Sequence, residues 1–573
     1  MSFSFRTRAQ ESRTAIERMY VTMRHLFNRG YYKPNGASGK SLREALFTLQ
    51  PEIYGSIADP EKVELDGLVY IIDRLPKGIE ECRFVKLIAD EGYRNTEKEV
   101  IIPSKRRRNC YRLDEETMLI EVTRGRSEIY DILTHLTFMY LEANKIARNA
   151  RDHDGQLTYE WQKLEEMVIG MNEAPNGQKV PTEYRDQAFS YLSTLLGRTF
   201  QETASAYQRL SGGRDYDHGL FHTVYYLGKK SMEEEKGEEK ERAIKFSSTL
   251  RDRIGHHIHG ERWATLIREA LTERGWENRP LHIISANLHS VRNCLYGLAA
   301  LKNKGGIEVP VSVYEMAEQL SLPENQEWNQ IIQEFALQHG MVALDDTAGT
   351  NIQVQLFDFA QIKDVPMPPA LAHLDLNYEE PPVILVMDYA FGEQAYELMD
   401  EMLKPFGPEE EAAGIRNVPS ISIMGKAGIL IGDKGDLMVP TAHIFEGTAD
   451  NYPFDNDLKP EDFADADDPV IAGAMVTVLG TSLQNKDILK YFKGSSWNVI
   501  GIEMEGAHYQ KAIQAAARIR RSIGEDVKVR YAYYASDNPL ITGATLASGS
   551  LGLVGVRPTY LITVKILEKI LQD

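Results

Sequence analysis

Apolar residues in the first half of the chain recur at the spacing of a helix. One series runs from Ile16 to Leu26 and a second from Ile129 to Met139. A helix has 3.6 residues per turn, so this spacing places the apolar side chains on one face. Two shorter apolar runs, residues 68–72 and 119–122, are typical of strands. The pattern therefore predicts a mainly helical first half that contains some strand.

Two charged segments interrupt this apolar pattern. Residues 233–242 are dense in charge, and we expect them to form an exposed loop or a helix end. Residues 105–108 form a basic run, which we interpret as a solvated loop because short charge runs usually face water.

The pattern changes near residues 275–280, where a helical segment gives way to the apolar run 281–286. Short apolar runs then alternate with segments of helical period, which predicts an α/β fold whose mixed or mostly parallel sheet is flanked by helices. We expect two domains, a mainly helical one of unknown role at residues 1–275 and an α/β one at 276–573. The expected later strands are residues 383–387, 420–424, 475–479, 499–503 and 529–535, and the expected helices are residues 393–403, 506–519 and 560–571.

Composition narrows the class of protein. The chain is 43% hydrophobic and 26% charged, which is ordinary for a globular protein. Its net charge of −19 disfavours a nucleic-acid-coating role, because phosphate binding needs clustered cations. Three scattered cysteines fit a reducing compartment. We find no apolar run of ~20 residues that would span a bilayer and no signal peptide at the start, so we expect a cytoplasmic protein without a membrane partner.

Two acidic motifs follow expected strands in the second half. Glu503, Met504 and Glu505 stand where a strand enters a helix, and Asp537 and Asn538 end a later apolar run. Carboxylates at the edge of a buried strand need partners, and ligand hydroxyls are natural ones. Alternatively, the first motif is an acidic helix start and the second an ordinary turn.

Together these motifs resemble the nucleoside phosphorylase and nucleosidase superfamily, whose members carry Glu-Met-Glu or Asp-Met-Glu before a strand that ends in Ser-Asp. The resemblance covers residues 281–573 in five ordered motifs, a far more specific signal than any one of them. We recognise no family resemblance in residues 1–275. The other segments that carry the resemblance are residues 283–287, 386–393, 423–430, 435–440 and 446–452.

Within the superfamily the chain is most similar to AMP nucleosidase, because of residues 537–540 and the loop 446–452. This resemblance implies the reaction of AMP with water to give adenine and ribose 5-phosphate, without a cofactor. Phosphorolysis of a purine nucleoside, with inorganic phosphate as second ligand, is the alternative. A module that senses nucleotides without catalysis is a third hypothesis. Relatives commonly assemble, so a homo-oligomer is expected.

The resemblance also implies roles for the acidic residues. Asp537 would be the general acid at purine N7, which requires a raised pKa that burial could supply. Glu505 would accept hydrogen bonds from the ribose 2′ and 3′ hydroxyls, with Met504 packed on the sugar and Glu503 supporting the loop. Their negative charge would favour the cationic, oxocarbenium-like transition state.

The phosphate-binding residue is less clearly written. Superfamily phosphorylases place an arginine soon after the first strand, but here His289 and Ser290 occupy that spacing and Arg292 comes two residues later. Arg292 either substitutes or is a surface residue on a helix, and Lys426 in the glycine turn is a second candidate. We assign four further residues to the substrate site on the same resemblance, namely Asn287, Gly392, Gly425 and Asn538.

Other residues could have a functional role, but a structural role is the simpler interpretation. Histidines at 218, 222, 256, 257 and 259 could ligate a metal, but no carboxylate or cysteine completes a known spacing, so we expect capping or core roles and no metal site. Tyr389, Phe391 and Tyr452 could stack on a purine, although aromatic residues are more often simply packed.

Overall fold

The computed structural model describes residues 7–173, 182–211, 219–237, 241–405, 416–480, 482–542 and 552–572. The chain divides into two compact units. The first comprises Met1–Thr123, Glu128–His256 and Ser482–Asn485, and the second comprises Arg124–Ser127, His257–Thr481 and Lys486–Asp573.

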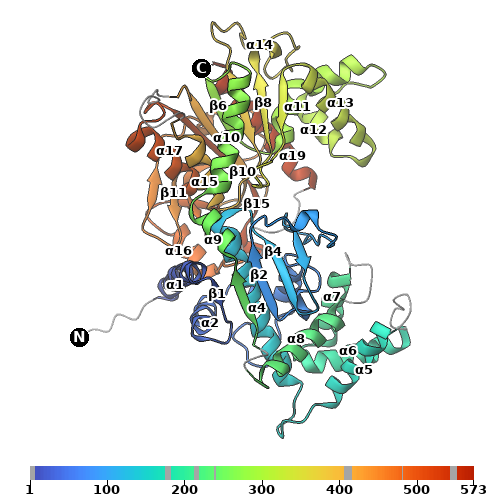
Figure 1. The fold of residues 1–573 in the computed structure, drawn as a ribbon. Helices are drawn as coiled ribbons and strands as arrows, with labels where there is room; N and C mark the ends of the chain where they lie inside the picture. The colour runs from blue at the N-terminus through green and yellow to red at the C-terminus, as the bar shows by residue number, and fades with distance from the viewer. Residues whose placement is uncertain are drawn as a thin grey trace, which may run out of the picture. The chain divides into compact units, whose positions relative to one another are not determined.

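The first unit contains a five-stranded sheet with helices packed around it (Figure 1). The strand order is β1-β5-β2-β4-β3, with β2 parallel to both β4 and β5 and the two edge strands antiparallel. The strands are β1 Tyr31–Tyr32, β2 Phe84–Ile88, β3 Cys110–Arg112, β4 Thr117–Glu121 and β5 Ala243–Phe246. The helices are α1 Arg8–Arg29, α2 Ala37–Leu49, α3 Leu65–Ile72, α4 Gly125–Asn149, α5 Tyr159–Glu173, α6 Thr182–Leu196, α7 Phe200–Ser211, α8 Leu220–Glu234 and α9 Ser248–Gly255. Residues 125–127 at the start of α4 are grouped with the second unit.

Periodicity located the long helices of this unit. α1 and α4 contain the two predicted apolar series, and their inward faces are buried. The predicted strand at 119–122 is confirmed as β4. The predicted strand at 68–72 is wrong, because these residues belong to α3, in which all five of them are buried. A fully buried apolar run has no period that separates helix from strand.

Two charged segments are also more buried than expected. In the basic run, Arg108 is fully buried and Arg106 is nearly so, and both pair with Asp131. The solvated-loop interpretation is therefore wrong for these two arginines. In the segment 233–242, Glu234 and Arg242 form a buried ion pair, so that segment is not simply an exposed loop.

The second unit is built on a ten-stranded mixed sheet whose order is β12-β11-β13-β14-β10-β6-β9-β8-β7. β15 pairs with both β10 and β11, so β10, β14, β13, β11 and β15 form a closed ring of pairings. The strands are β6 Leu281–Ser285, β7 Met341–Leu344, β8 Val354–Asp358, β9 Val383–Met387, β10 Ser420–Ile429, β11 Leu437–Phe445, β12 Asn451–Pro453, β13 Val470–Thr477, β14 Val499–Glu503 and β15 Lys528–Asp537.

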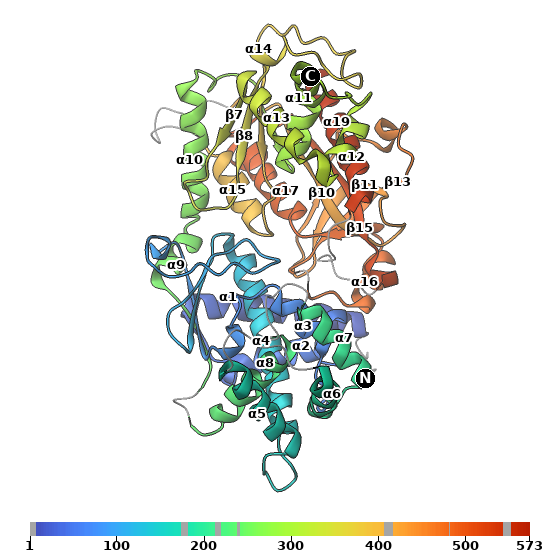
Figure 2. The ribbon, with the colours of Figure 1, turned by 90° about the vertical axis from the view of Figure 1, so that its right-hand side faces the viewer.

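Helices cover this sheet in two groups, each with its own apolar core (Figure 2). α10, α15 and α17 pack on one core, and α11, α12, α13 and α19 pack on the other. The helices are α10 Ile258–Glu273, α11 Leu288–Lys304, α12 Val313–Leu320, α13 Gln326–Gln338, α14 Phe359–Ile362, α15 Gln394–Met402, α16 Lys486–Lys493, α17 Gly506–Gln514, α18 Pro539–Thr542 and α19 Val556–Gln572.

The predicted strands of the second half are all present, and the α/β fold class is confirmed. β9 and β14 match their predicted bounds, whereas β10 and β13 are longer than expected. The predicted helix at 506–519 is α17, which continues as a π-helical turn over Ala515–Arg520. Among the described helices, none combines the length and apolar composition that a membrane crossing requires.

Candidate active site

A pocket of about 760 Å³ lies where several strands of the second unit end. β6, β9, β10 and β15 are mutually parallel neighbours, so their carboxyl ends meet at one edge of the sheet. Six of the ten predicted site residues line the pocket: Asn287, Gly425, Lys426, Glu503, Met504 and Glu505. Polar residues of α11, α13 and α19 complete the wall, among them His289, Asn293, Asn329, Thr559 and Tyr560.

Glu503 is held by the protein itself. Its Oε2 accepts the backbone N–H groups of Glu505 and Gly506, each at 2.5 Å. Its Oε1 accepts the Thr477 hydroxyl and lies 3.4 Å from His443 Nδ1. Burial by itself raises the pKa of Glu503, but His443 and these hydrogen bonds outweigh it, so the pKa lies below its usual value. Glu503 is thus an ionised brace for the turn that presents Glu505.

The pKa of Glu505 is shifted in the opposite direction. Its Oε1 accepts the backbone N–H of Gly392 at 2.9 Å. Burial, together with the negative charge of Glu503, raises the pKa of Glu505 to about 8. A carboxyl group with a strongly raised pKa in the wall of a pocket is a candidate for chemistry or ligand binding.

Lys426 and Asp537 interact electrostatically beside the pocket. The pKa of Lys426 is lowered, chiefly because the pocket wall withdraws its ammonium group from water, and the Asp537 carboxylate works against this shift. Asp537 ends β15, is 6% exposed, and accepts the Ser536 hydroxyl at 2.6 Å. A buried carboxyl group and a cation therefore stand close together at the strand ends.

Arg292 contacts other helices and is not among the residues that line the pocket. Its guanidinium donates to Gln333 Oε1 at 2.6 Å and to Asn329 Oδ1 at 3.3 Å, which ties α11 to α13. The pocket wall nearby holds His289, whose pKa is lowered to about 4 by burial and by Arg292. This end of the pocket therefore presents a neutral imidazole at neutral pH.

The remaining predicted residues shape the loops around the pocket. Asn287 caps α11 by accepting the Ser290 N–H. Gly392 reaches the pocket through its hydrogen bond to Glu505, and Asn538 donates to the Gly432 carbonyl. Of the aromatic candidates, Tyr389 lines the pocket, whereas Phe391 and Tyr452 do not. The stretch 543–551 that follows the Asp537 motif lies outside the described residues.

Sequence reasoning missed His443 and Thr477, the two side chains that hold Glu503. They come from β11 and β13, and in the folded sheet β13 pairs with β14 on one side and with β11 on the other. His443 stands in a largely apolar, buried strand and was not singled out in the sequence. Both residues are buried, and His443 stacks on Phe454 at 5.4 Å between ring centroids.

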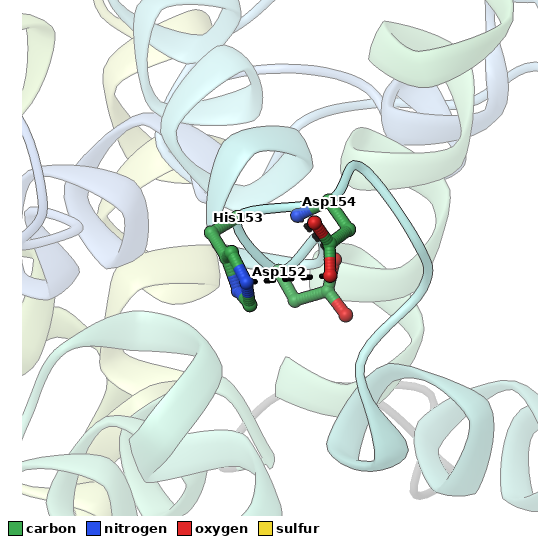
Figure 3. A group of neighbouring side chains, drawn as sticks. All are labelled: Asp152, His153 and Asp154. Atoms are coloured by element: carbon green, nitrogen blue, oxygen red, sulfur yellow. Dashed lines mark hydrogen bonds and ion pairs between the residues drawn. The ribbon is translucent and has the colours of Figure 1, made fainter.

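The histidines that we considered as metal ligands have other partners in the described part of the chain. His259 bonds to the Ala348 carbonyl, and His222 bonds to Glu81. His218 lies outside the described residues. A group with metal-ligand spacing is found elsewhere, at Asp152, His153 and Asp154 in the first unit (Figure 3). These three residues are exposed, and Asp152 accepts the N–H of Asp154 as in an ordinary turn, so the group carries no metal assignment.

Several solved structures match about half of this chain at low similarity. Uridine phosphorylase from Schistosoma mansoni is 11% identical, with a TM-score of 0.31, and the match covers 53% of this chain and 91% of that one. The 5′-methylthioadenosine/S-adenosyl homocysteine nucleosidase of Campylobacter jejuni is 12% identical, with a TM-score of 0.29, over 51% and 99%. Futalosine hydrolase from Helicobacter pylori is 11% identical, with a TM-score of 0.28, over 51% and 98%. At these similarities the neighbours do not identify a substrate.

The family comparison covers nearly the whole chain. No curated protein has a matching sequence. A family model matches residues 40–309 and 312–572 and therefore spans both units. The chain belongs to the family of unknown function DUF6909.

Proposed function

We propose that the second unit cleaves the N-ribosidic bond of a purine nucleotide, converting AMP and water into adenine and ribose 5-phosphate. The observation that carries this proposal is that Glu505 and Lys426 line the same pocket, with Asp537 buried beside Lys426. The reaction needs three groups: an acceptor for the ribose hydroxyls, a cation for the phosphate and an acid for the leaving base. The order of the sequence motifs supports the same reaction.

In this reaction Asp537 gives its proton to the purine as the bond to C1′ breaks. Water adds its oxygen to C1′, and the proton that it loses restores the acid, so the reaction is balanced. The sugar passes through a cationic state, which the ionised carboxylate of Glu503 favours electrostatically. Glu505 accepts the ribose hydroxyls, while Glu503 keeps Glu505 in place through the backbone.

Phosphorolysis of a purine nucleoside is the second candidate, and the interaction of Lys426 with Asp537 favours it. If Asp537 protonates the purine base, Lys426 close to Asp537 lies nearer to the glycosidic bond than to C5′. That position suits an attacking phosphate better than the substrate's own 5′-phosphate. The two reactions differ in what occupies a single anion site.

Adenine release from AMP and from adenosine, each with and without inorganic phosphate, separates the two candidates. The proposal predicts that AMP exceeds adenosine by at least ~10-fold in kcat/KM, because a lost charge-assisted hydrogen bond costs ~1.5–3 kcal/mol. Lys426→Ala should remove that preference, and Arg292→Ala should preserve it. A requirement for added phosphate with adenosine would favour phosphorolysis. AMP binding without cleavage would favour a nucleotide-sensing module.

We also propose that the protein is a homo-oligomer assembled through the second unit, on the resemblance to the superfamily. Light scattering should give a mass that is a multiple of 64.9 kDa. A strict monomer under active conditions would contradict this proposal.

A further inference from the structure

A short segment from the first half of the chain packs against the loop that follows β9. This segment, Arg124–Ser127, belongs to the second unit although the residues on both sides of it in sequence belong to the first. The backbone N–H of Glu393 donates to Ser127 Oγ at 2.9 Å. Arg126 Nη1 donates to the Glu393 carboxylate at 3.1 Å, and both side chains are less than 20% exposed. Glu393 is therefore held through its backbone and its side chain at once.

The neighbouring residues of the loop are held by the same segment. Gly392 has φ +56°, and a Cβ there would meet the Ser127 side chain, so the close approach requires glycine. The Arg124 guanidinium lies over the Phe391 ring, 4.9 Å from its centroid. Three consecutive loop residues thus make separate contacts with one segment.

These contacts continue to the pocket through one hydrogen bond. The Gly392 N–H donates to Glu505 Oε1 at 2.9 Å, and Glu505 lines the pocket. A carboxylate with one oxygen fixed by a backbone N–H presents its other oxygen in a set direction. The direction of that oxygen decides how well it meets a pair of neighbouring hydroxyl groups.

We propose that Arg126 and Ser127 are positioning residues that hold the Gly392 N–H against Glu505 and so set the preference of the pocket for sugars with a 2′-hydroxyl group. The inference rests on the proposed function. It assigns a purine ribonucleoside or ribonucleotide as the substrate class, in preference to the 2′-deoxy form. Arg126 and Ser127 act through the loop and touch no substrate.

The test compares the full chain with Arg126→Gln, Arg126→Lys and Ser127→Ala. A matched control is Arg279→Gln, which breaks the ion pair Arg279–Asp358, also partly buried in the second unit. Arg279 precedes β6, whereas the pocket lies at the other end of that strand. Calorimetry gives Kd for adenosine and for 2′-deoxyadenosine, and purine release gives kcat and KM for the same pair.

The wild type should bind adenosine more tightly than 2′-deoxyadenosine. Arg126→Gln and Ser127→Ala should reduce the ratio of the two affinities by about tenfold or bring it to one. The reason is that the hydrogen bond between Glu505 and the 2′-hydroxyl group is then misplaced. Arg126→Lys should restore part of the ratio. Arg279→Gln should lower the thermal midpoint but leave the ratio of the two affinities unchanged.

An unchanged ratio in folded Arg126→Gln and Ser127→Ala would overturn the inference while leaving the proposed function in place. If Arg126→Gln does not fold, Ser127→Ala and Arg126→Lys decide the question. If the wild type binds neither these nucleosides nor AMP and releases no purine from any of them, the proposed function and this inference fall together.

Discussion

Asp131 in the first unit and Glu505 in the second are both carboxyl groups withdrawn from water, yet their surroundings differ. Asp131 accepts two hydrogen bonds from Arg106, at 2.9 and 3.0 Å, and one from Arg108 at 3.0 Å. His135 lies 3.2 Å away on the next turn of α4. Burial alone would raise the pKa of Asp131, but Arg106 and His135 hold it well below the usual value.

Glu505 is not compensated in this way. The charge that acts on it most strongly is that of another carboxylate, Glu503, and its pKa rises to about 8 because of burial and this negative charge. Glu505 also opens onto a pocket, whereas Asp131 is enclosed by its partners. A buried charge with a full set of partners is part of the architecture, and one without them beside a pocket is placed for a ligand.

Removing the Asp131 charge should have the largest effect on stability. Asp131→Asn leaves Arg106 and Arg108 without their main partner, which should cost ~3–5 kcal/mol in the free energy of unfolding. Thermal or urea unfolding of the first unit measures this loss. Glu235→Gln, which breaks the exposed Arg151–Glu235 pair, is the control and should cost ~1 kcal/mol or less. A loss for Asp131→Asn no larger than the control's would show that the buried network is not architectural.

Glu505→Gln should lower activity without lowering the stability of the fold. The amide only partly reproduces a charge-assisted acceptor, so kcat/KM for AMP should fall by ~10-fold or more. The loss should be smaller for 2′-deoxy-AMP, which lacks one of the two hydroxyl groups. Purine release from both substrates, with the thermal midpoint at neutral pH as control, checks this. Equal losses on both substrates would mean that Glu505 does not read the sugar edge.

The smallest effect concerns stability at alkaline pH. The pKa of Glu505 in the folded protein is raised above its ordinary value of about 4.5. The stability linked to its protonated form is therefore complete below about pH 4.5 and is lost as the pH rises through about 8. Because the side chain is only partly buried, we expect this loss to be ~1–2 kcal/mol, or a few degrees in thermal midpoint.

The measurement compares the wild type and Glu505→Gln at pH 5 and at pH 9. The variant should lose less stability than the wild type between these two pH values. Parallel losses would place the pKa of Glu505 near its ordinary value and remove the contrast with Asp131.

The amino-acid sequence predicts the strands of the second unit better than the elements of the first. β9 and β14 are continuous apolar runs bounded by polar or turn residues, so their bounds are readable. Residues 68–72 are equally apolar but form α3, because burial on every side removes the period. Arg106 and Arg108 belong to a basic run that looks solvated until Asp131 on α4 is brought against them.

The candidate site was predictable only where its residues adjoin a strand end. Glu505, Met504 and Lys426 follow or end apolar runs, and all three line the pocket. The supporting contacts join distant parts of the chain, and Ser127 and Glu393, for example, are 266 residues apart. No periodicity or spacing in one sequence encodes such pairs, because they arise when the sheet closes and its loops meet.

Adenine release from AMP by the purified wild type, measured beside Asp537→Asn, tests the central claim most directly. The account predicts release by the wild type and a fall of at least ~100-fold in kcat for the folded variant, since a positioned general acid contributes ~10²–10⁴-fold. Near-wild-type turnover in folded Asp537→Asn, or no purine released by the wild type from AMP or from adenosine with phosphate, would contradict it.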